Sequence, residues 1–162
     1  MNTAKETAAE LRKIPWFREI TPEHFQTIAA ITHLRGVRAG EVLFRQGDKA
    51  NEIYIVIEGR VALDMLVPHR GKIRFYTAEP WEVFGWSSAT PIIHQRTAGA
   101  TAVIDGLIAC INAEKLHQAC DDDHDLGYLV MRRLANIVAS RLLVTRLQLI
   151  DMFANPESQN AK

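Results

Sequence analysis

Cysteine is scarce in this sequence, neither sign of charge is in excess, and no apolar run is long enough to cross a bilayer. Cys110 and Cys120 are too few for a disulfide framework and lack CxxC spacing, so we expect two reduced thiols. Lys+Arg and Asp+Glu number 19 each, so no net positive field draws the chain toward nucleic acid. The polar N-terminus lacks the apolar middle region of a secretory signal. These absences predict a cytoplasmic protein that does not associate with membranes.

The sequence also lacks the patterns that mark common catalytic and metal sites. No glycine-rich loop for nucleoside triphosphates occurs, and no nucleophile stands in a recognisable context with a base. The histidines form no HxH or HxxxH pair that would supply neighbouring metal ligands: His24, His33, His69, His94, His117 and His124. We therefore predict no catalytic residues, no metal site and no cofactor, which argues against both an enzyme and a cupin-like metal protein.

The 162 residues, of which 48% are hydrophobic, suffice for one domain with its own core. Their periodicity divides the chain into three zones and a polar tail, residues 155–162. Residues 1–32 are expected to form helices of this same domain, with Thr21 as an N-cap and Pro22 in the first turn. Residues 33–112 have the pattern of short strands separated by turns, and residues 113–154 are helical again. The chain is therefore predicted to be mainly β with flanking helices.

Turn residues recur through residues 33–112 at the intervals of a barrel or sandwich, and we predict a double-stranded β-helix, or jelly roll. Residues 51–67, NEIYIVIEGRVALDMLV, predict two strands joined at Glu58 and Gly59. Residues 100–112, ATAVIDGLIACIN, predict a hairpin around Asp105 and Gly106. Two apolar sets are each expected to share one face of a strand: Ile53, Ile55 and Ile57, then Val61, Leu63 and Met65.

The last helical zone begins with a short helix and an acidic run, Asp121 to Asp123, that is placed to cap the long helix after it. Steps of four and three along that helix trace a coiled-coil seam, apolar except at one threonine: Met131, Ala135, Val138, Leu142, Thr145, Leu149 and Met152. A second apolar set lies beside it: Val130, Leu134, Ile137 and Val144. Because so long a helix extends beyond one small domain, we predict that the seam pairs two chains in a homodimer. The alternative is a helix lying in a groove of its own barrel, which also buries two faces.

A resemblance to cyclic-nucleotide-binding domains begins at residues 40–63, GEVLFRQGDKANEIYIVIEGRVAL, in their Gly-Glu, Gly-Asp and strand-Gly-strand spacing. Residues 84–98, FGWSSATPIIHQRTA, stand where this family has its phosphate-binding cassette: glycine and glutamate, a short helix, then Arg-Ser/Thr-Ala. Residues 141–145, RLLVT, resemble the central helix of the catabolite-activator and FNR-like regulators. The resemblance covers residues 10–153, and it implies a stand-alone cyclic-nucleotide-binding domain with a jelly-roll fold.

The resemblance assigns ligand contacts residue by residue. Arg96 matches the arginine that pairs with the cyclic phosphate, and its charged guanidinium fork suits two phosphate oxygens. Thr97, followed by Ala98 in the signature, matches the residue whose hydroxyl or backbone N–H also contacts that phosphate. Gly85 matches the glycine that lets the backbone approach the sugar. Together these residues are predicted to form an anion site.

Some further positions of the family pattern are kept, whereas Trp86 and Ser87, which is polar where the family usually has an aliphatic residue, depart from it. Ser87 and Ser88 open the short helix, whose N–H groups are expected to add anion donors. Thr145 matches the central-helix residue that contacts the purine. Trp86, however, stands where the family has a glutamate that accepts a hydrogen bond from the ribose 2′-hydroxyl. An indole has one donor and no acceptor, so the change removes about 1–3 kcal/mol of ligand binding.

Two classes of function stay open. In the first, a sensor binds a small anionic ligand, most obviously cyclic AMP or cyclic GMP, between the jelly roll and the central helix, and signals through an unidentified protein partner. A variant of this class takes a ligand without a ribose. In the second, a ligand-free scaffold dimer has its pocket plugged by Trp86. Only residues 154–162 follow Phe153, too few for the helix-turn-helix of the DNA-binding relatives, so we expect no DNA binding through this chain.

Overall fold

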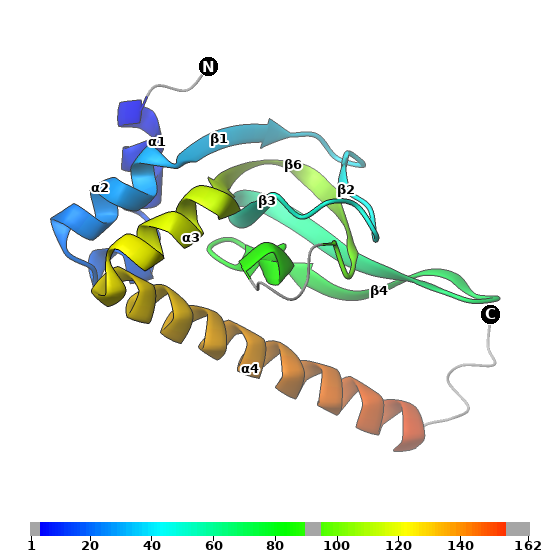
Figure 1. The fold of residues 1–162 in the computed structure, drawn as a ribbon. Coiled ribbons are helices and arrows are strands. Elements are labelled where there is room, and N and C mark those ends of the chain that lie inside the picture. Colours follow the sequence, from blue (N-terminus) through cyan, green and yellow to red (C-terminus); the bar gives the residue numbers. More distant parts are fainter. Residues whose placement is uncertain (1–3, 90–94, 155–162) are drawn as a thin grey trace. The chain divides into compact units, whose positions relative to one another are not determined.

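The computed structural model describes residues 4–89 and 95–154, and the chain divides into two compact units. The first unit, residues 1–127, holds the sheet together with the helices that precede it and the short helix that follows it. The second unit, residues 128–162, holds most of the last helix. In the first unit the short helices gather at one end of the sheet (Figure 1).

Three short helical segments precede the sheet: α1 (Ala4–Leu11), the single turn η1 (Pro15–Arg18) and α2 (Pro22–Ala30). The predicted cap of α2 is confirmed, because the hydroxyl of Thr21 accepts a hydrogen bond from the backbone N–H of His24. Phe17 of η1 packs edge-on against Phe25 of α2, with 5.9 Å between ring centroids. The apolar run before α2 is therefore a packed turn that fixes the first helices against each other.

In the described part of the chain, six antiparallel strands form one sheet in the order β1-β6-β3-β4, with β2 paired to β6 and β5 paired to β3. Their bounds are β1 (Thr32–Val37), β2 (Val42–Phe44), β3 (Glu52–Val67), β4 (Gly71–Ala78), β5 (Val83–Phe84) and β6 (Gly99–Asn112). Every strand contributes to one buried apolar cluster. At its centre the ring of Tyr54 stacks 5.6 Å from Phe44 and 5.1 Å from Phe84. This sheet with its helices is the predicted jelly roll.

The hairpins predicted at Glu58-Gly59 and at Asp105-Gly106 are wrong. β3 and β6 each run unbroken through these positions, and they pair with each other. The register of that pairing shifts on both sides of Glu58. A Cβ on Gly59, whose φ is +89°, would lie 2.9 Å from the carbonyl oxygen of Asp105. The glycines therefore allow two long, bent strands to cross closely, rather than forming two turns.

The alternation predicted for β3 holds only in part. Three isoleucines are buried as expected: Ile53, Ile55 and Ile57. Tyr54 and Val56, which lie between them, are buried as well and belong to the core cluster, so this stretch is covered on both faces. Of the second apolar set, Val61 and Leu63 are buried, whereas Met65, expected on the same face of the strand, is 43% exposed. The register of the β3–β4 pairing shifts between Leu63 and Asp64, the point at which the buried part of β3 ends.

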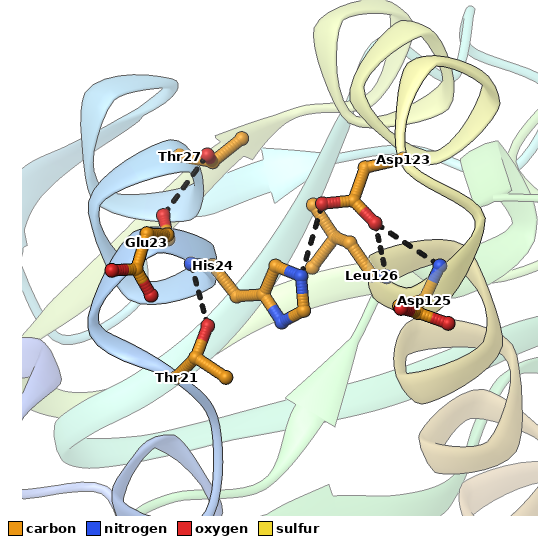
Figure 2. A network of polar contacts seen from close by, with 7 residues as sticks. All are labelled: Thr21, Glu23, His24, Thr27, Asp123, Asp125 and Leu126. Carbon is orange, nitrogen blue, oxygen red and sulfur yellow. Dashed lines mark hydrogen bonds and ion pairs between the residues drawn. The ribbon is translucent and has the colours of Figure 1, made fainter.

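Two helices follow the sheet, α3 (Ala113–Asp122) and α4 (His124–Ala154), and they meet at Asp123. The Oδ1 atom of Asp123 accepts hydrogen bonds from the backbone N–H groups of Asp125 and Leu126, each at 3.0 Å, so the predicted acidic cap is confirmed at this residue. Its Oδ2 atom lies 3.0 Å from Nε2 of His24 in α2 (Figure 2). One carboxylate thus caps α4 and ties the helices before the sheet to those after it.

Residues 128–154 of α4 belong to the second unit, and the predicted seam is exposed within one copy of the chain. All seven seam positions are exposed: Met131, Ala135, Val138, Leu142, Thr145, Leu149 and Met152. A stripe of this kind offers apolar surface to a partner helix, and the dimer stays a prediction. Among the described residues, no helix combines the length and the apolar character needed to cross a membrane.

Candidate ligand-binding site

The predicted cassette, residues 84–98, is described in two pieces. Phe84 ends β5, Gly85 follows it, and residues Trp86–Ala89 form the single turn η2. Residues 95–98 lead into β6, while residues 90–94, which include His94, lie outside the described residues. Because Phe84 pairs with Tyr54 in the β5–β3 ladder, the sheet brings the start of the cassette beside β3.

Arg96 is buried at the centre of this site, with 3% of its surface exposed. Its Nη1 donates to the backbone carbonyl of Gly85 and its Nη2 to the carbonyl of Glu52, both at 2.7 Å. The guanidinium carbon lies 4.3 Å from the ring centroid of Phe44 and 5.2 Å from that of Tyr54. The prediction that Arg96 faces inward rather than lying on a surface loop therefore agrees with its position.

Ser88 of η2 uses the same two carbonyl groups as Arg96. Its Oγ lies 2.8 Å from the carbonyl oxygen of Glu52 and 3.0 Å from that of Gly85. We call Arg96, Ser88 and these two carbonyls the arginine cradle. The cradle joins β3, the end of β5, η2 and the residue before the Thr97-Ala98 signature. Ser88 was expected to open a helix that offers N–H groups, but its hydroxyl instead holds the cradle, and η2 is only one turn long.

The cradle carries a buried positive charge. Within residues 4–89 and 95–154, no carboxylate lies within ion-pair distance of Arg96, and its Nε has no hydrogen-bond partner. Burial lowers the pKa of Arg96 and raises the pKa of neighbouring Tyr54 to about 12, so at neutral pH the guanidinium stays charged and the phenol neutral. Two carbonyl dipoles and two aromatic faces stabilise the cation, and the nearby charges of Glu52 and Asp48 favour its charged form without forming an ion pair with it. An anion at this place would complete the neutralisation.

Gly85 is required where β5 meets the cradle. Its φ is +68°, and a Cβ there would lie 2.8 Å from both Nη1 of Arg96 and Cδ2 of Tyr54. The family resemblance explains this glycine by close approach to a sugar. In the structure the same space is needed by the arginine and the tyrosine of the cradle.

The other predicted site residues differ in exposure. Ser87 is buried, whereas Trp86 and Ala98 are half-buried and Thr97 is exposed. Trp86 is not a member of the core cluster. Thr145 belongs to the second unit, where its Oγ1 donates a hydrogen bond to the carbonyl of Arg141 at 2.9 Å. The described residues therefore bring Gly85, Ser88 and Arg96 into contact.

Sequence reasoning did not find three of the residues that build the site. Phe44 and Tyr54 stack on Arg96, and Glu52 supplies a carbonyl to it. The alternation predicted for β3 put Tyr54 on the face opposite the three isoleucines, and no local signal indicated that it meets an arginine beyond β5. Glu52 also belongs to a cluster of possible metal ligands with His33 and Cys110, in which the donor atoms lie within 4.8 Å of one another.

A family model for the cyclic nucleotide-binding domain matches residues 34–123, more than half of the chain. The chain belongs to this family. The match runs from within β1 to the end of α3, so the residues of the arginine cradle lie inside it. The family is a regulatory, ligand-binding one.

Three comparisons show how the family likeness extends over the chain. The Pycsar effector protein BcPycTIR of Burkholderia cepacia is 28% identical over 116 residues, which are 72% of this chain and 35% of that protein. The chain thus spans about a third of the length of that relative. The crystal structure of the catabolite activator protein of Thermus thermophilus has a TM-score of 0.69 and 27% identity, covering 90% of this chain and 66% of the other. A cyclic nucleotide-binding domain from Methylobacillus flagellatus has a TM-score of 0.79 at 15% identity, covering 89% and 84%, and shows the shared fold.

Proposed function

We propose that this chain is a non-enzymatic, cytoplasmic sensor module that binds a small anionic ligand of the cyclic-nucleotide class at the arginine cradle. The observation that carries the proposal is the buried guanidinium of Arg96, which lies in the family's cassette without a carboxylate partner among the described residues. A cyclic phosphate offers two oxygens to a guanidinium fork, and it would replace carbonyl oxygens as the acceptors.

The cradle fits the phosphate of such a ligand better than its sugar. Arg96 supplies the donor fork, and the exposed Thr97 beside it offers a hydroxyl and an N–H on the open side. Trp86 offers no acceptor for a ribose 2′-hydroxyl, so the sugar contributes less to binding than it does in family members with the glutamate. Binding is therefore expected to depend on the phosphate and on stacking against the half-buried indole.

A sensor needs an output, and α4 is the element proposed to carry it. Its exposed apolar seam suits pairing with a second copy of the chain, and a partner protein would read the state of that pair. A ligand shifts the equilibrium between two arrangements of the paired helices only by binding one arrangement more tightly than the other. The role of Thr145, which lies on the seam, would be to make the helix register sensitive to the ligand.

A second candidate function is a ligand-free scaffold dimer. It is favoured by the fact that both terminal nitrogens of Arg96 already donate to carbonyl groups at 2.7 Å. In this case Trp86 closes the pocket and the cradle is a structural clamp. A sensor for an anionic ligand without a ribose remains a variant of the first proposal.

Isothermal titration calorimetry and thermal-shift measurements on the full chain separate these candidates. The ligands are the cyclic 3′,5′-monophosphates of adenosine, guanosine, cytidine and uridine, with 5′-AMP and inorganic phosphate as acyclic controls. A ligand present at 100 times its dissociation constant stabilises the folded state by about 2.7 kcal/mol, so binding must raise the melting temperature. Stabilisation by a cyclic nucleotide but not by phosphate supports the sensor. No stabilisation by any nucleotide at millimolar concentration would reject the cyclic-nucleotide sensor and leave the scaffold or a sensor for a ligand without a ribose.

A further inference from the structure

A second cluster of chemically distinctive side chains lies across three neighbouring strands, apart from the Arg96 guanidinium. His33 of β1 is directly opposite Cys110 of β6, and Cys110 is directly opposite Tyr54 of β3. Glu52 precedes Tyr54 by two residues, so their side chains project from the same face of β3. The ladder thus brings an imidazole, a thiol and a carboxylate to one place, although they are far apart in the sequence.

The donor atoms of these three residues are close enough to share one ion. All of them lie within 4.8 Å of one another, and Nδ1 of His33 is 3.9 Å from Oε1 of Glu52. Ligand atoms around a tetrahedral Zn²⁺ lie about 3.5 Å apart, given bond lengths of about 2.0–2.3 Å. The remaining distance requires only side-chain rotation, and the His33 side chain, 62% exposed, has room to turn.

The surroundings of the cluster suit metal binding. The hydroxyl of Tyr54 donates to Oε2 of Glu52 at 3.2 Å, which leaves Oε1 directed toward His33. A hydrogen bond of this kind fixes the orientation of a carboxylate ligand. The neighbouring cation, Arg35, is paired with Glu41, so its charge is compensated within the described residues. Cys110 is fully buried and belongs to the core cluster, Glu52 is half-buried and His33 is exposed, so the cluster extends from the core to the surface at His33.

The alternative role for Cys110, as a reactive thiol, does not fit its position. Burial raises the pKa of the Cys110 thiol to about 12, so without a metal it is a neutral thiol and a poor nucleophile. A metal ion changes this chemistry, because a thiol that coordinates Zn²⁺ releases its proton to solvent and binds as the thiolate.

We propose that His33, Glu52 and Cys110 form a three-residue binding site for Zn²⁺, with a fourth coordination position open to water or another ligand. Nitrogen, oxygen and sulfur donors together match the preferences of this borderline ion, whereas Mg²⁺ and Ca²⁺ prefer oxygen ligands alone. The site joins β1, β6 and β3, and it shares Glu52 with the arginine cradle through that residue's backbone carbonyl.

Cobalt substitution tests the site in the full chain without any nucleotide, so the result does not depend on the proposed sensor function. The chain is stripped with a chelator and titrated with Co²⁺, whose thiolate complex absorbs in the near ultraviolet through sulfur-to-metal charge transfer. We expect this band to appear at one Co²⁺ per chain and to disappear when Zn²⁺ is added. Zn²⁺ alone is expected to raise the melting temperature, while Mg²⁺ is not.

Two variants test the ligands Cys110 and His33, and a third is their control. Cys110→Ala should abolish the charge-transfer band, and His33→Gln, on an exposed side chain whose loss does not disturb the core, should weaken Co²⁺ binding at least tenfold. Cys120→Ser, at the half-exposed second cysteine, is the matched control and should keep both the band and the affinity. A wild-type chain without the band, a band that persists in Cys110→Ala, or a band lost in Cys120→Ser would each overturn the proposal. Unchanged Co²⁺ affinity in His33→Gln would overturn it as well. This variant still tests the site if Cys110→Ala does not fold.

Discussion

Nη2 of Arg96 and the backbone carbonyl oxygen of Glu52 lie 2.7 Å apart, although 44 positions separate the two residues in the sequence. The same guanidinium holds the carbonyl of Gly85 at an equal distance. A ligand phosphate would have to compete with these carbonyl groups for the fork. Binding of a phosphate at the cradle would therefore be coupled to the backbone of β3 and of Gly85, which follows β5.

The first prediction concerns the charge of the cradle. Arg96→Leu should abolish any rise in melting temperature caused by a cyclic nucleotide, because the phosphate loses the buried cation of the cradle. The shift is measured by differential scanning fluorimetry relative to each variant's own melting temperature without ligand. Arg74→Leu, on an exposed position of β4, is the matched control and should respond like the wild type. An undiminished response in Arg96→Leu would place the ligand elsewhere.

The second prediction concerns the space that the cradle needs. Gly85→Ala should lower the free energy of unfolding by at least about 1 kcal/mol more than Gly71→Ala. Both glycines have positive φ, so both variants carry backbone strain, but a Cβ at Gly71 meets nothing within 4 Å. At Gly85 it lies 2.8 Å from Arg96 and from Tyr54. Urea denaturation measures the difference, provided that the unfolding free energies of the variants depend on urea concentration with the same slope. Equal losses of unfolding free energy in the two variants would contradict the close packing.

The third prediction concerns the missing sugar contact. Trp86→Glu should tighten cyclic AMP binding about tenfold to a hundredfold, since an acceptor for the 2′-hydroxyl contributes about 1–3 kcal/mol. The gain should be absent with 2′-deoxy cyclic AMP, which lacks that hydroxyl. Trp86→Ala removes the indole without adding an acceptor, and it separates relief of a closed pocket from gain of a hydrogen bond. If Ala and Glu improve binding equally, Trp86 acts as a plug.

The starts of α2 and α4 could be predicted from the sequence, because each is capped by a side chain next to it in the chain. α2 begins at Pro22 because the hydroxyl of Thr21 accepts a hydrogen bond from the N–H of His24, three residues later, and so caps the first turn. Asp123 starts α4 in the same way. The acidic run did not show which aspartate would cap, because Asp121 and Asp122 continue α3 instead. These features depend on residues close together in the chain, so one sequence suffices to predict them.

Non-local packing explains what the sequence did not reveal. Asp105-Gly106 has the composition of a hairpin turn, but Gly106 is a glycine because β3 crosses β6 there, next to Glu58. The cassette pattern identified Arg96, and its burial agrees with the prediction. Its acceptors were not predictable, since any residue has a backbone carbonyl and no side-chain type indicates which one is used. The same holds for His33 and Cys110, which only the strand register brings together.

The fourth prediction concerns the contact between Asp123 and His24. Hydrogen bonds from the backbone of Leu126, and then from His24, lower the pKa of Asp123 below its ordinary value of 3.8. A lowered carboxyl pKa stabilises the fold above the unfolded-state pKa, and that contribution is lost as pH falls through the folded-state value. Asp123→Ala should therefore lower the urea midpoint at pH 7, and the difference from wild type should shrink below about pH 4. Asp121→Ala, at an exposed position without a capping role, is the control and should change little at either pH.

The fifth prediction concerns the seam of α4. Leu142 is 49% exposed in a single copy of the chain, and the seam model places it against its counterpart in a second copy. Leu142→Glu would bury two like charges at that contact, so multi-angle light scattering should report a dimer for wild type and a monomer for the variant. Ser140→Glu adds the same charge at an exposed position off the seam and should leave the dimer intact. If Leu142→Glu remains dimeric while both variants keep their helix content by circular dichroism, the seam does not join the two copies. A wild-type monomer would likewise reject the predicted pairing of two copies along the seam.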